Sequence, residues 1–335
     1  MNHFQQDMRL PQALWQLFSA TLAALILLGG CASSPVACPL PSTPNIDLPT
    51  QGISAHRGGR LGCPGNTLGA FQRAIDRGVH QIELDVRLTA DDIVVVAHDN
   101  AITDKAHSLH ISESTLQEIQ ELDLESCKGE THAQHVPTLE DALAIMPSNI
   151  WINVDMKHND PHVATRVAET VAKAERWDQV IFSARKKSVS SVRQVAKETE
   201  RQSWVSNMSR ELFRSQYINA TIRSCAEFIQ LIEIPYLPFI RGKPSPETMA
   251  RLDEAGIRVN YSWLRGNDEE ELQHHLQNLF SRGVDFVLVD HVEQAMQAAD
   301  NLGLPRLVPH WVHASRPITF SPPQHSVHTR TSQRK

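Results

Sequence analysis

Residues 81–99, QIELDVRLTADDIVVVAHD, contain two strand-like segments together with acidic residues and one histidine that suit a functional site. Residues 81–86 are predicted as a strand, and the β-branched run at 93–97 as a second one. In a strand Glu83 and Asp85 point to the same side, because successive side chains alternate. Two unpaired carboxylates on one face of an otherwise apolar strand would repel each other. The pair therefore predicts either a bound cation or basic partners.

Strand-like and helix-like segments alternate on both sides of this stretch. A short strand at 53–55 is followed by a helix-like segment at 67–77 that ends before Gly78, and this order repeats to a closing helix at 292–301. The predicted strands are 53–55, 81–86, 93–97, 150–156, 180–182, 203–205, 228–234, 257–261 and 284–289.

Strict alternation of strands and helices predicts a parallel sheet, and about eight strands in this length favour a closed barrel. An open, doubly wound sheet would require a glycine-rich phosphate-binding turn after the first strand. Residues 56–59, HRGG, do not match that turn. We therefore expect the α/β class and a single-domain (β/α)₈ barrel, the TIM barrel.

Residues 1–30 have the features of an export signal. Arg9 precedes an apolar run that is too short for a membrane-spanning helix. The run ends in LGGC at 28–31, which resembles a bacterial lipobox, so Cys31 is predicted to carry lipid. Ala32 follows, where an aspartate would indicate retention in the inner membrane. We expect an outer-membrane anchor facing the periplasm of a Gram-negative bacterium; the alternative is an ordinary cleaved signal with a chance cysteine.

Two proline-containing segments flank the predicted barrel. Residues 31–50 contain five prolines, which predicts an extended tether. Residues 310–335 contain three prolines, four basic residues and no acid, which predicts a disordered basic tail. The remaining segment, 51–309, has the size of one (β/α)₈ barrel.

Charge and cysteine content limit the class of protein. The formal net charge is −6; because the predicted signal is neutral and the tail carries +4, the rest carries about −10. This balance argues against nucleic acid as a partner. Beyond Cys31, cysteines 38, 63, 127 and 225 could form disulfides outside the cytoplasm in three connectivities. The absence of CxxC spacing argues against a zinc–cysteine site, and the oligomeric state stays open.

Four polar clusters follow predicted strands, at 56–57, 83–85, 98–99 and 155–157. The carboxyl ends of barrel strands meet at one mouth, where active sites form. Asp155 should therefore join Glu83 and Asp85 as a third carboxylate, and such oxygen ligands suit Mg²⁺ or Ca²⁺. The alternative is a structural ion-pair network, in which these acids pair with Arg57 and Lys157.

Two histidines, His56 and His98, each follow a predicted strand. A single such histidine is more often a packing residue, but two beside a carboxylate cluster suit phosphodiester cleavage, which removes one proton and delivers another. Arg57 could bind phosphate oxygens in a fork, and Lys157 could stabilise the transition state by its charge. The constellation predicts an enzyme.

The order and spacing of these residues resemble the glycerophosphodiester phosphodiesterase family between about residues 53 and 290. The matching positions are HRG at 56–58, NT at 66–67, Phe71, Gly78, ELDV at 83–86, Thr89, Asp92, Val96, HD at 98–99, VPTLE at 136–140 and GVD at 283–285. The resemblance implies a barrel and metal-dependent release of glycerol 3-phosphate and an alcohol. It also implies that a substrate hydroxyl attacks first and that a cyclic phosphate is then hydrolysed.

The resemblance implies a role for each residue of the predicted site. It implies ligation of a divalent metal by the three acids, Glu83, Asp85 and Asp155. It implies acid–base catalysis by the two histidines, His56 and His98, in an order that it leaves open. It implies phosphate binding by the two cations, Arg57 and Lys157.

Three positions depart from the family pattern. Gly65 stands where Pro-Glu-Asn-Thr has its acid, Asp155 replaces a glutamate, and Ser262 occupies the position of an aromatic residue, between Tyr261 and Trp263. These departures leave two alternatives open. One is a sphingomyelinase D-like phospholipase acting on intact or lyso-phospholipids. The other is a non-catalytic barrel lipoprotein used for binding.

Overall fold

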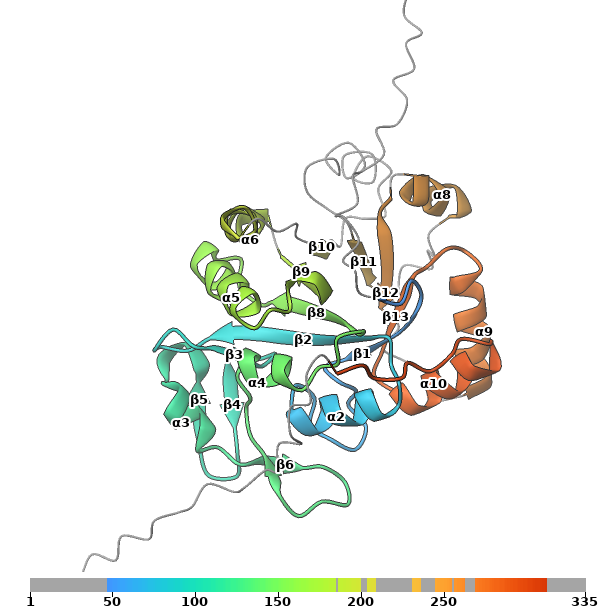
Figure 1. The fold of residues 1–335 in the computed structure, drawn as a ribbon. Helices are drawn as coiled ribbons and strands as arrows, with labels where there is room; N and C mark the ends of the chain where they lie inside the picture. Colours follow the sequence, from blue (N-terminus) through green and yellow to red (C-terminus); the bar gives the residue numbers. More distant parts are fainter. Residues whose placement is uncertain are drawn as a thin grey trace, which may run out of the picture. The chain divides into compact units, whose positions relative to one another are not determined.

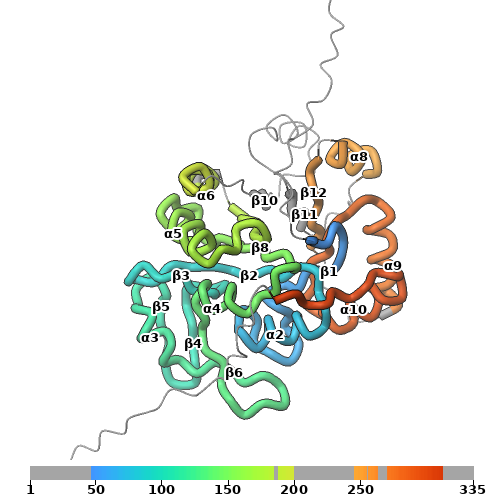
Figure 2. Tube along the Cα trace, viewed as in Figure 1, coloured from blue at the N-terminus to red at the C-terminus, as the bar shows by residue number. Residues whose placement is uncertain are grey.

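The computed structural model describes residues 47–184, 186–199, 204–208, 231–235, 245–254, 256–262 and 269–311 (Figures 1 and 2). They all belong to one compact unit that begins at Cys38. The predicted signal, Cys31 and most of the tether lie outside the described residues, as does the tail from residue 312. No helix among the described residues is long and apolar enough to cross a bilayer.

Eight parallel strands form a closed ring. β1 (Gly52–His56) pairs with β2 (Gln81–Leu88) on one side and with β13 (Phe286–Val289) on the other, so the sheet closes on itself. From β2 the ring continues through β8 (Trp151–Met156), β9 (Val180–Ser183), β10 (Trp204–Met208), β11 (Leu231–Pro235) and β12 (Arg258–Ser262) to β13. The predicted (β/α)₈ barrel is confirmed.

Helices surround the ring of strands (Figure 1). They are α2 (Leu68–Asp76), α4 (Leu139–Ala144), α5 (Pro161–Lys173), α6 (Lys186–Glu198), α8 (Pro246–Glu254), α9 (Glu269–Phe280) and α10 (Val292–Asn301). α2 shows why these segments form helices: the Thr67 side chain caps the free amide of Ala70, and an apolar stripe that includes Phe71 and Ile75 is buried. Burying a side chain such as Phe71 contributes about 1.5–3 kcal/mol.

The strand predicted at 93–97 does not belong to the ring, so the expectation of strict alternation was wrong there. β3 (Val94–Val96) runs antiparallel to β2, with Val96 opposite Val86. β1 ends at His56, opposite Glu83, and leaves the rest of that edge of β2 free for β3. His98 therefore reaches the mouth because the chain folds back along β2, and not as the carboxyl end of a barrel strand.

A small insertion that the sequence analysis did not predict follows β3. It contains β4 (Ala101–Thr103), β5 (Ser108–His110), a 3₁₀ turn (Ile111–Glu113), α3 (Leu116–Gln120), β6 (Leu124–Ser126) and β7 (Ala133–Gln134). A disulfide between Cys63 and Cys127 joins it to the loop after β1. Closing a loop of 64 residues stabilises the fold by about 4 kcal/mol. Cys38 and Cys225 lie outside the described residues.

The interior of the barrel is layered. Trp151, Ile181 and Phe286 form a buried apolar cluster towards the amino ends of the strands. Next to it lie buried polar side chains: Gln81 is the register partner of Trp151, and the Ser54 hydroxyl donates to Gln81 Oε1 at 2.7 Å. His56 and Glu83 come two residues further along the same strands and are paired in register. Alternation along β1 and β2 therefore places the predicted site next to these polar side chains, on the side of the strand carboxyl ends.

Asp285, just before β13, is a partly buried acid that should weaken the fold at neutral pH. Burial raises its pKa to about 6, although the Val259 amide donates to its carboxylate. Because folding raises the pKa, the contribution of Asp285 to stability is fully present below pH 4 and is lost as the pH rises through 6. We expect Asp285→Asn to raise the free energy of unfolding by about 1–3 kcal/mol at pH 7.5 and to change it little at pH 4.

Urea unfolding of Asp285→Asn at both pH values checks this expectation, with the exposed acid variant Asp123→Asn as the control. A gain of the same size at both pH values would mean that the carboxylate charge is not the cause.

Candidate active site

Three carboxylates meet at the mouth of the barrel. Asp85 of β2 and Asp155 of β8 are register partners, and Glu83 precedes Asp85 on the same face. One oxygen of each acid lies within 4.8 Å of an oxygen of the other two. Glu83 and Asp85 are buried, whereas Asp155 is partly exposed. The structure thus brings together the three acids that the sequence analysis named.

Two cations share this cluster. Lys157 Nζ lies 2.5 Å from Asp85 Oδ1 and donates to Asp155 Oδ2 at 2.7 Å. Arg57 Nε lies 3.0 Å from Asp85 Oδ2, and the main-chain amide of Arg57 donates to Glu83 Oε2 at 3.0 Å. The ion pairs of the alternative network are therefore present in the same residues. Three acids and two cations leave the cluster with a formal charge of −1.

The ion pairs hold both partners in their charged forms. Burial opposes ionisation of Asp85, but Lys157, Arg57 and a hydrogen bond from Asn66 outweigh it and lower the pKa of this carboxyl. Burial likewise favours neutral Lys157, but Asp155 and Asp85 outweigh it and raise the pKa of the ammonium. Charged acids are the form in which carboxylates bind metal ions.

The donor set fits a divalent cation. Asp85 Oδ1 is buried and lies 2.5 Å from Lys157 Nζ. A buried acceptor beside two further carboxylates is the kind of site that hard cations occupy. An ion of charge +2 would change the formal charge of the cluster from −1 to +1, which suits an anionic substrate.

His56 is oriented by a residue that the sequence analysis missed. Its Nδ1 lies 2.6 Å from Asp290 Oδ1, at the end of β13. Because a carboxylate only accepts, Nδ1 carries the proton and Nε2 is the basic nitrogen. The two residues are 234 positions apart. The only sequence signal for Asp290 is its position directly after a strand, which many acids share.

His98 lies on the segment that returns along β2. The amide of its neighbour Ala97 donates to the main-chain oxygen of Asp85 at 2.9 Å, which brings this segment to the carboxylate cluster. The side chain is 37% exposed, and its Nδ1 lies 2.9 Å from Asp99 Oδ1. An exposed imidazole beside a buried acid cluster can exchange protons with solvent. The predicted catalytic roles of His56 and His98 remain predictions.

Asn66 is a second residue whose role the sequence analysis did not see, although it belongs to the quoted motif. Its Nδ2 donates to Asp85 Oδ2 at 2.7 Å, and its Oδ1 accepts from the Asp85 amide at 3.2 Å. It is buried, at a left-handed φ of 63°. Asparagine tolerates this conformation better than most residues. The loop after β1 therefore fixes Asp85 through the side chain of Asn66.

The structure gives a packing context for two departures from the family pattern. A Cβ at Gly65 would lie 3.0 Å from Arg57 Cβ, so glycine lets the loop pack closely against the arginine that pairs with Asp85. Ser262, on β12, is buried, as is Tyr261. Trp263, the other aromatic neighbour, lies outside the described residues.

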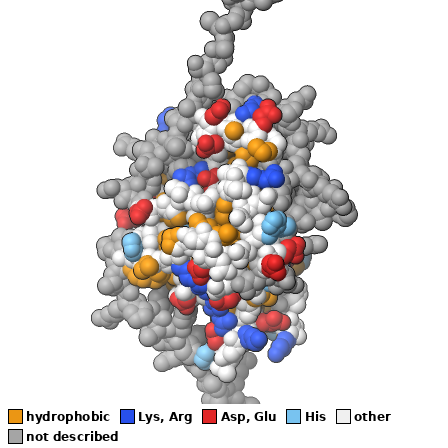
Figure 3. All heavy atoms as spheres, turned by 90° about the vertical axis from the view of Figure 1, so that its right-hand side faces the viewer, with side chains coloured by type: hydrophobic (Ala, Val, Ile, Leu, Met, Phe, Trp, Pro, Cys, Tyr) orange, Lys and Arg blue, Asp and Glu red, His pale blue; other side chains and the backbone are white. Residues whose placement is uncertain are grey.

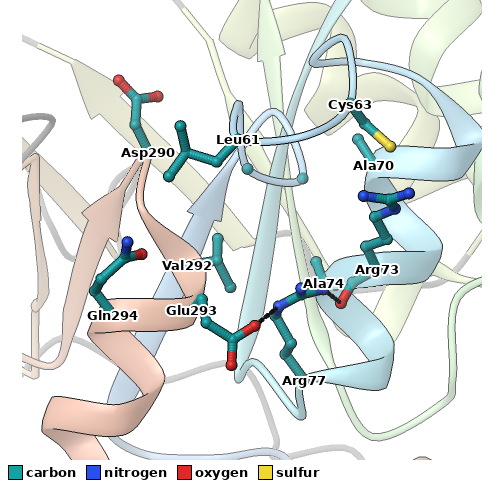
Figure 4. Close-up of a pocket in the computed structure, with 12 residues that line it drawn as sticks. Leu61, Cys63, Ala70, Arg73, Ala74, Arg77, Asp290, Val292, Glu293 and Gln294 are labelled. Carbon is teal, nitrogen blue, oxygen red and sulfur yellow. Dashed lines mark hydrogen bonds and ion pairs between the residues drawn. The ribbon is translucent and has the colours of Figure 1, made fainter. Parts of the chain in front are cut away.

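A pocket of about 150 Å³ lies between α2, α10 and the loop after β1 (Figure 4). Asp290 is at its margin, and none of the three carboxylates lines it. Its arginines already have acidic partners: Arg73 pairs with Glu130, and Arg77 with Glu293. We place the candidate active site at the carboxylates, because the predicted site residues converge there. On the face drawn in Figure 3, the coloured acidic and basic side chains are interspersed.

Comparison with known proteins identifies relatives of this chain. Residues 56–294 match the model of the Glycerophosphoryl diester phosphodiesterase family. A Glycerophosphodiester phosphodiesterase of Caldanaerobacter subterraneus is 30% identical over 138 residues, which cover 39% of this chain and 57% of the relative. The human Lysophospholipase D GDPD1 is 31% identical over 131 residues, 36% of this chain and 41% of the relative. The chain spans about half the length of the curated relatives it matches.

Solved structures share the fold at lower identity. A Glycerophosphoryl diester phosphodiesterase from Parabacteroides distasonis has a TM-score of 0.59 and 22% identity, and covers 76% of this chain and 88% of its own. An Oleispira antarctica phosphodiesterase, in complex with the product sn-glycerol-3-phosphate, has a TM-score of 0.57 and 19% identity, with coverage of 74% and 96%. At these identities the likeness establishes the fold alone.

Proposed function

The chain belongs to the glycerophosphoryl diester phosphodiesterase family, and we propose that it hydrolyses glycerophosphodiesters to glycerol 3-phosphate and an alcohol. The observation that carries the proposal is the cluster of Glu83, Asp85 and Asp155 at the barrel mouth, with Arg57 and Lys157 in contact with it. The relative from Caldanaerobacter subterraneus and the structure with sn-glycerol-3-phosphate support the same substrate class.

In this proposal the three acids hold one divalent cation, Mg²⁺ or Ca²⁺. When bound, the ion supplies positive charge that polarises the phosphoryl group. The fork of Arg57 and the ammonium of Lys157 bind phosphate oxygens and stabilise the charge that develops on them. Asn66 and the Arg57 amide keep the acids in place by their hydrogen bonds to Asp85 and Glu83.

His56 and His98 move the protons. In the first step one histidine takes the proton from the glycerol hydroxyl next to the phosphate, and the other delivers a proton to the departing alcohol. The hydroxyl oxygen forms a bond to phosphorus as the bond to the alcohol breaks, which leaves a cyclic phosphate. In the second step water opens the ring with the two roles exchanged. Asp290, which contacts Nδ1 of His56, holds the imidazole in one orientation and tautomer.

A second candidate activity is hydrolysis of lyso-phospholipids, as in sphingomyelinase D-like phospholipases. It is favoured by the likeness to the human Lysophospholipase D. A third possibility is a barrel that binds without catalysis. The two enzymes differ in the substrate that they cleave, whereas the binding barrel cleaves neither substrate.

The test is an assay of the purified chain on glycerophosphocholine and on lysophosphatidylcholine, with and without EDTA. We expect turnover of glycerophosphocholine that EDTA abolishes and that excess Mg²⁺ or Ca²⁺ restores. Turnover of lysophosphatidylcholine alone would favour the phospholipase. Absence of activity on both substrates, in a chain that still binds the ion, would favour the binding barrel. Activity that EDTA leaves unchanged would contradict the metal site.

We also propose that the chain is exported and held at the outer membrane by lipid on Cys31, facing the periplasm. The LGGC motif at 28–31 and the proline-rich tether support this placement. In a Gram-negative host, labelled palmitate should be incorporated into the full chain and not into Cys31→Ser. Equal labelling of the two chains would contradict the anchor.

A further inference from the structure

Arg87 lies at the mouth of the barrel but has no place in the mechanism above. It follows Asp85 by two residues on β2, so both side chains are on the same face of the strand. Arg87 Nε and Nη2 both donate to the main-chain oxygen of His98, at 2.9 and 2.6 Å. Its Nη1 lies 3.3 Å from His158 Nε2. The guanidinium therefore spans β2, the segment after β3 and the end of β8.

His98 depends on its main chain for its position. Its side-chain partner is Asp99, which is its sequence neighbour and is 78% exposed, so this pair cannot tie the imidazole to the barrel. Two main-chain contacts hold this residue instead. The Ala97 amide donates to the main-chain oxygen of Asp85, and Arg87 donates two hydrogen bonds to the main-chain oxygen of His98, on the other side of its Cα. A planar fork on one oxygen restricts direction as well as distance.

The contact with His158 anchors the other end of the guanidinium. Arginine only donates hydrogen bonds, so His158 Nε2 accepts and its ring is neutral in this arrangement. Burial and the neighbouring Arg87 both lower the pKa of His158, which agrees with this state. His158 follows Lys157, so the same guanidinium that holds His98 is tied to the strand end that carries the phosphate-binding lysine.

From this geometry we propose that Arg87 is a positioning residue that holds His98 in place for proton transfer. The proposal rests on the proposed function, since it assigns Arg87 a part in that reaction. Three of the guanidinium hydrogen-bond contacts go to His98 and His158, so Arg87 acts through these residues and not on the substrate. Lysine could keep the charge but could not bridge the same acceptors in one plane.

The test is a double-mutant cycle between Arg87→Gln and His98→Ala, assayed on glycerophosphocholine. We expect Arg87→Gln to lower kcat about 10–100-fold, with KM and the metal requirement changed less than about threefold. In the His98→Ala background the same substitution should change kcat less than about twofold, because no imidazole is left to position. Arg87→Lys should recover only part of the loss.

Arg166→Gln is the matched control, because Arg166 also donates to a main-chain carbonyl, that of Asp92, but does so on the exposed surface. It should leave kcat unchanged. Equal losses from Arg87→Gln in both backgrounds, a rise in KM alone, or no loss at all would each overturn the proposal.

Hydrogen exchange separates this inference from the proposed function, because it needs no substrate. In Arg87→Gln the Ala97 amide should exchange about tenfold faster than in the wild type, while Arg166→Gln leaves it unchanged. If the wild type does not cleave glycerophosphodiesters, the proposed function fails. Faster exchange in Arg87→Gln would still support the positioning of His98 by Arg87. If the exchange rate of the Ala97 amide is unchanged in Arg87→Gln, Arg87 does not position His98, whatever the activity.

Discussion

Asp85→Asn is expected to lower kcat on glycerophosphocholine by about a thousandfold and to abolish the response to divalent ions. Asp85 supplies a buried carboxylate to the cluster and is the shared partner of Arg57 and Lys157. Removing its charge takes the formal charge of the cluster from −1 to 0, so an ion of charge +2 loses most of its attraction. The amide also places a donor beside two cations that need an acceptor.

The same substitution should destabilise the fold, by about 3 kcal/mol, because two partly buried cations, Arg57 and Lys157, each lose a charged partner. Thermal unfolding with and without Mg²⁺ or Ca²⁺ distinguishes the two effects. At a concentration a hundred times its Kd, the ion should stabilise the wild type by about 2.7 kcal/mol and leave Asp85→Asn unchanged. Asp76→Asn, at an exposed acid of α2 that accepts a hydrogen bond from Gln72, is the control and should behave as the wild type.

One result would remove the metal from this account. If divalent ions leave the stability of the wild type unchanged and Asp85→Asn keeps most of its activity, the three acids serve as a structural ion-pair network with Arg57 and Lys157. The ion pair between Lys157 and Asp85 would then be the main contribution of these residues.

His98→Ala is expected to lower kcat at least about a hundredfold on glycerophosphocholine without unfolding the chain. The side chain is partly exposed and pairs with an exposed acid, so its loss costs little stability. His56→Ala should lower kcat as much. Steady-state kinetics and circular dichroism on each variant check both halves of the expectation, with His110→Ala, at an exposed histidine of the insertion, as the control.

A substrate with a p-nitrophenol leaving group shows which histidine is the acid. Such a leaving group departs without being protonated, so the variant that lacks the acid should recover most of its rate and the variant that lacks the base should not. A His98→Ala chain that keeps most of its activity on glycerophosphocholine would take His98 out of the mechanism.

Local patterns predicted most of the regular structure. Every barrel strand that the sequence analysis placed is present within a few residues, and the helix predicted at 67–77 is α2, with Thr67 as its cap. These elements depend on side-chain alternation, capping and propensity, which act between near neighbours in the chain. The two acids of β2 were predictable for the same reason, since residues two apart on a strand share a face.

Contacts between distant segments were not predictable in this way. β3 has the composition of a barrel strand, and only the early end of β1 at His56 shows that it pairs antiparallel with β2 instead. Similarly, the sequence allowed three disulfide connectivities, and the described residues contain the pair Cys63–Cys127. Composition cannot distinguish such choices, because they depend on which edges and side chains the closed barrel brings together.

Local sequence patterns alone were enough to predict the barrel class and to name the acids at 83, 85 and 155 and the histidines at 56 and 98 as candidate site residues. The residues that hold them became visible in the folded chain: Asp290 on His56, Asn66 on Asp85 and Arg87 on the main chain of His98. The physical reason is the range of the interactions. Strand alternation is set by adjacent residues, whereas these hydrogen bonds join parts of the chain that meet only when the ring of strands closes and β3 folds back along β2.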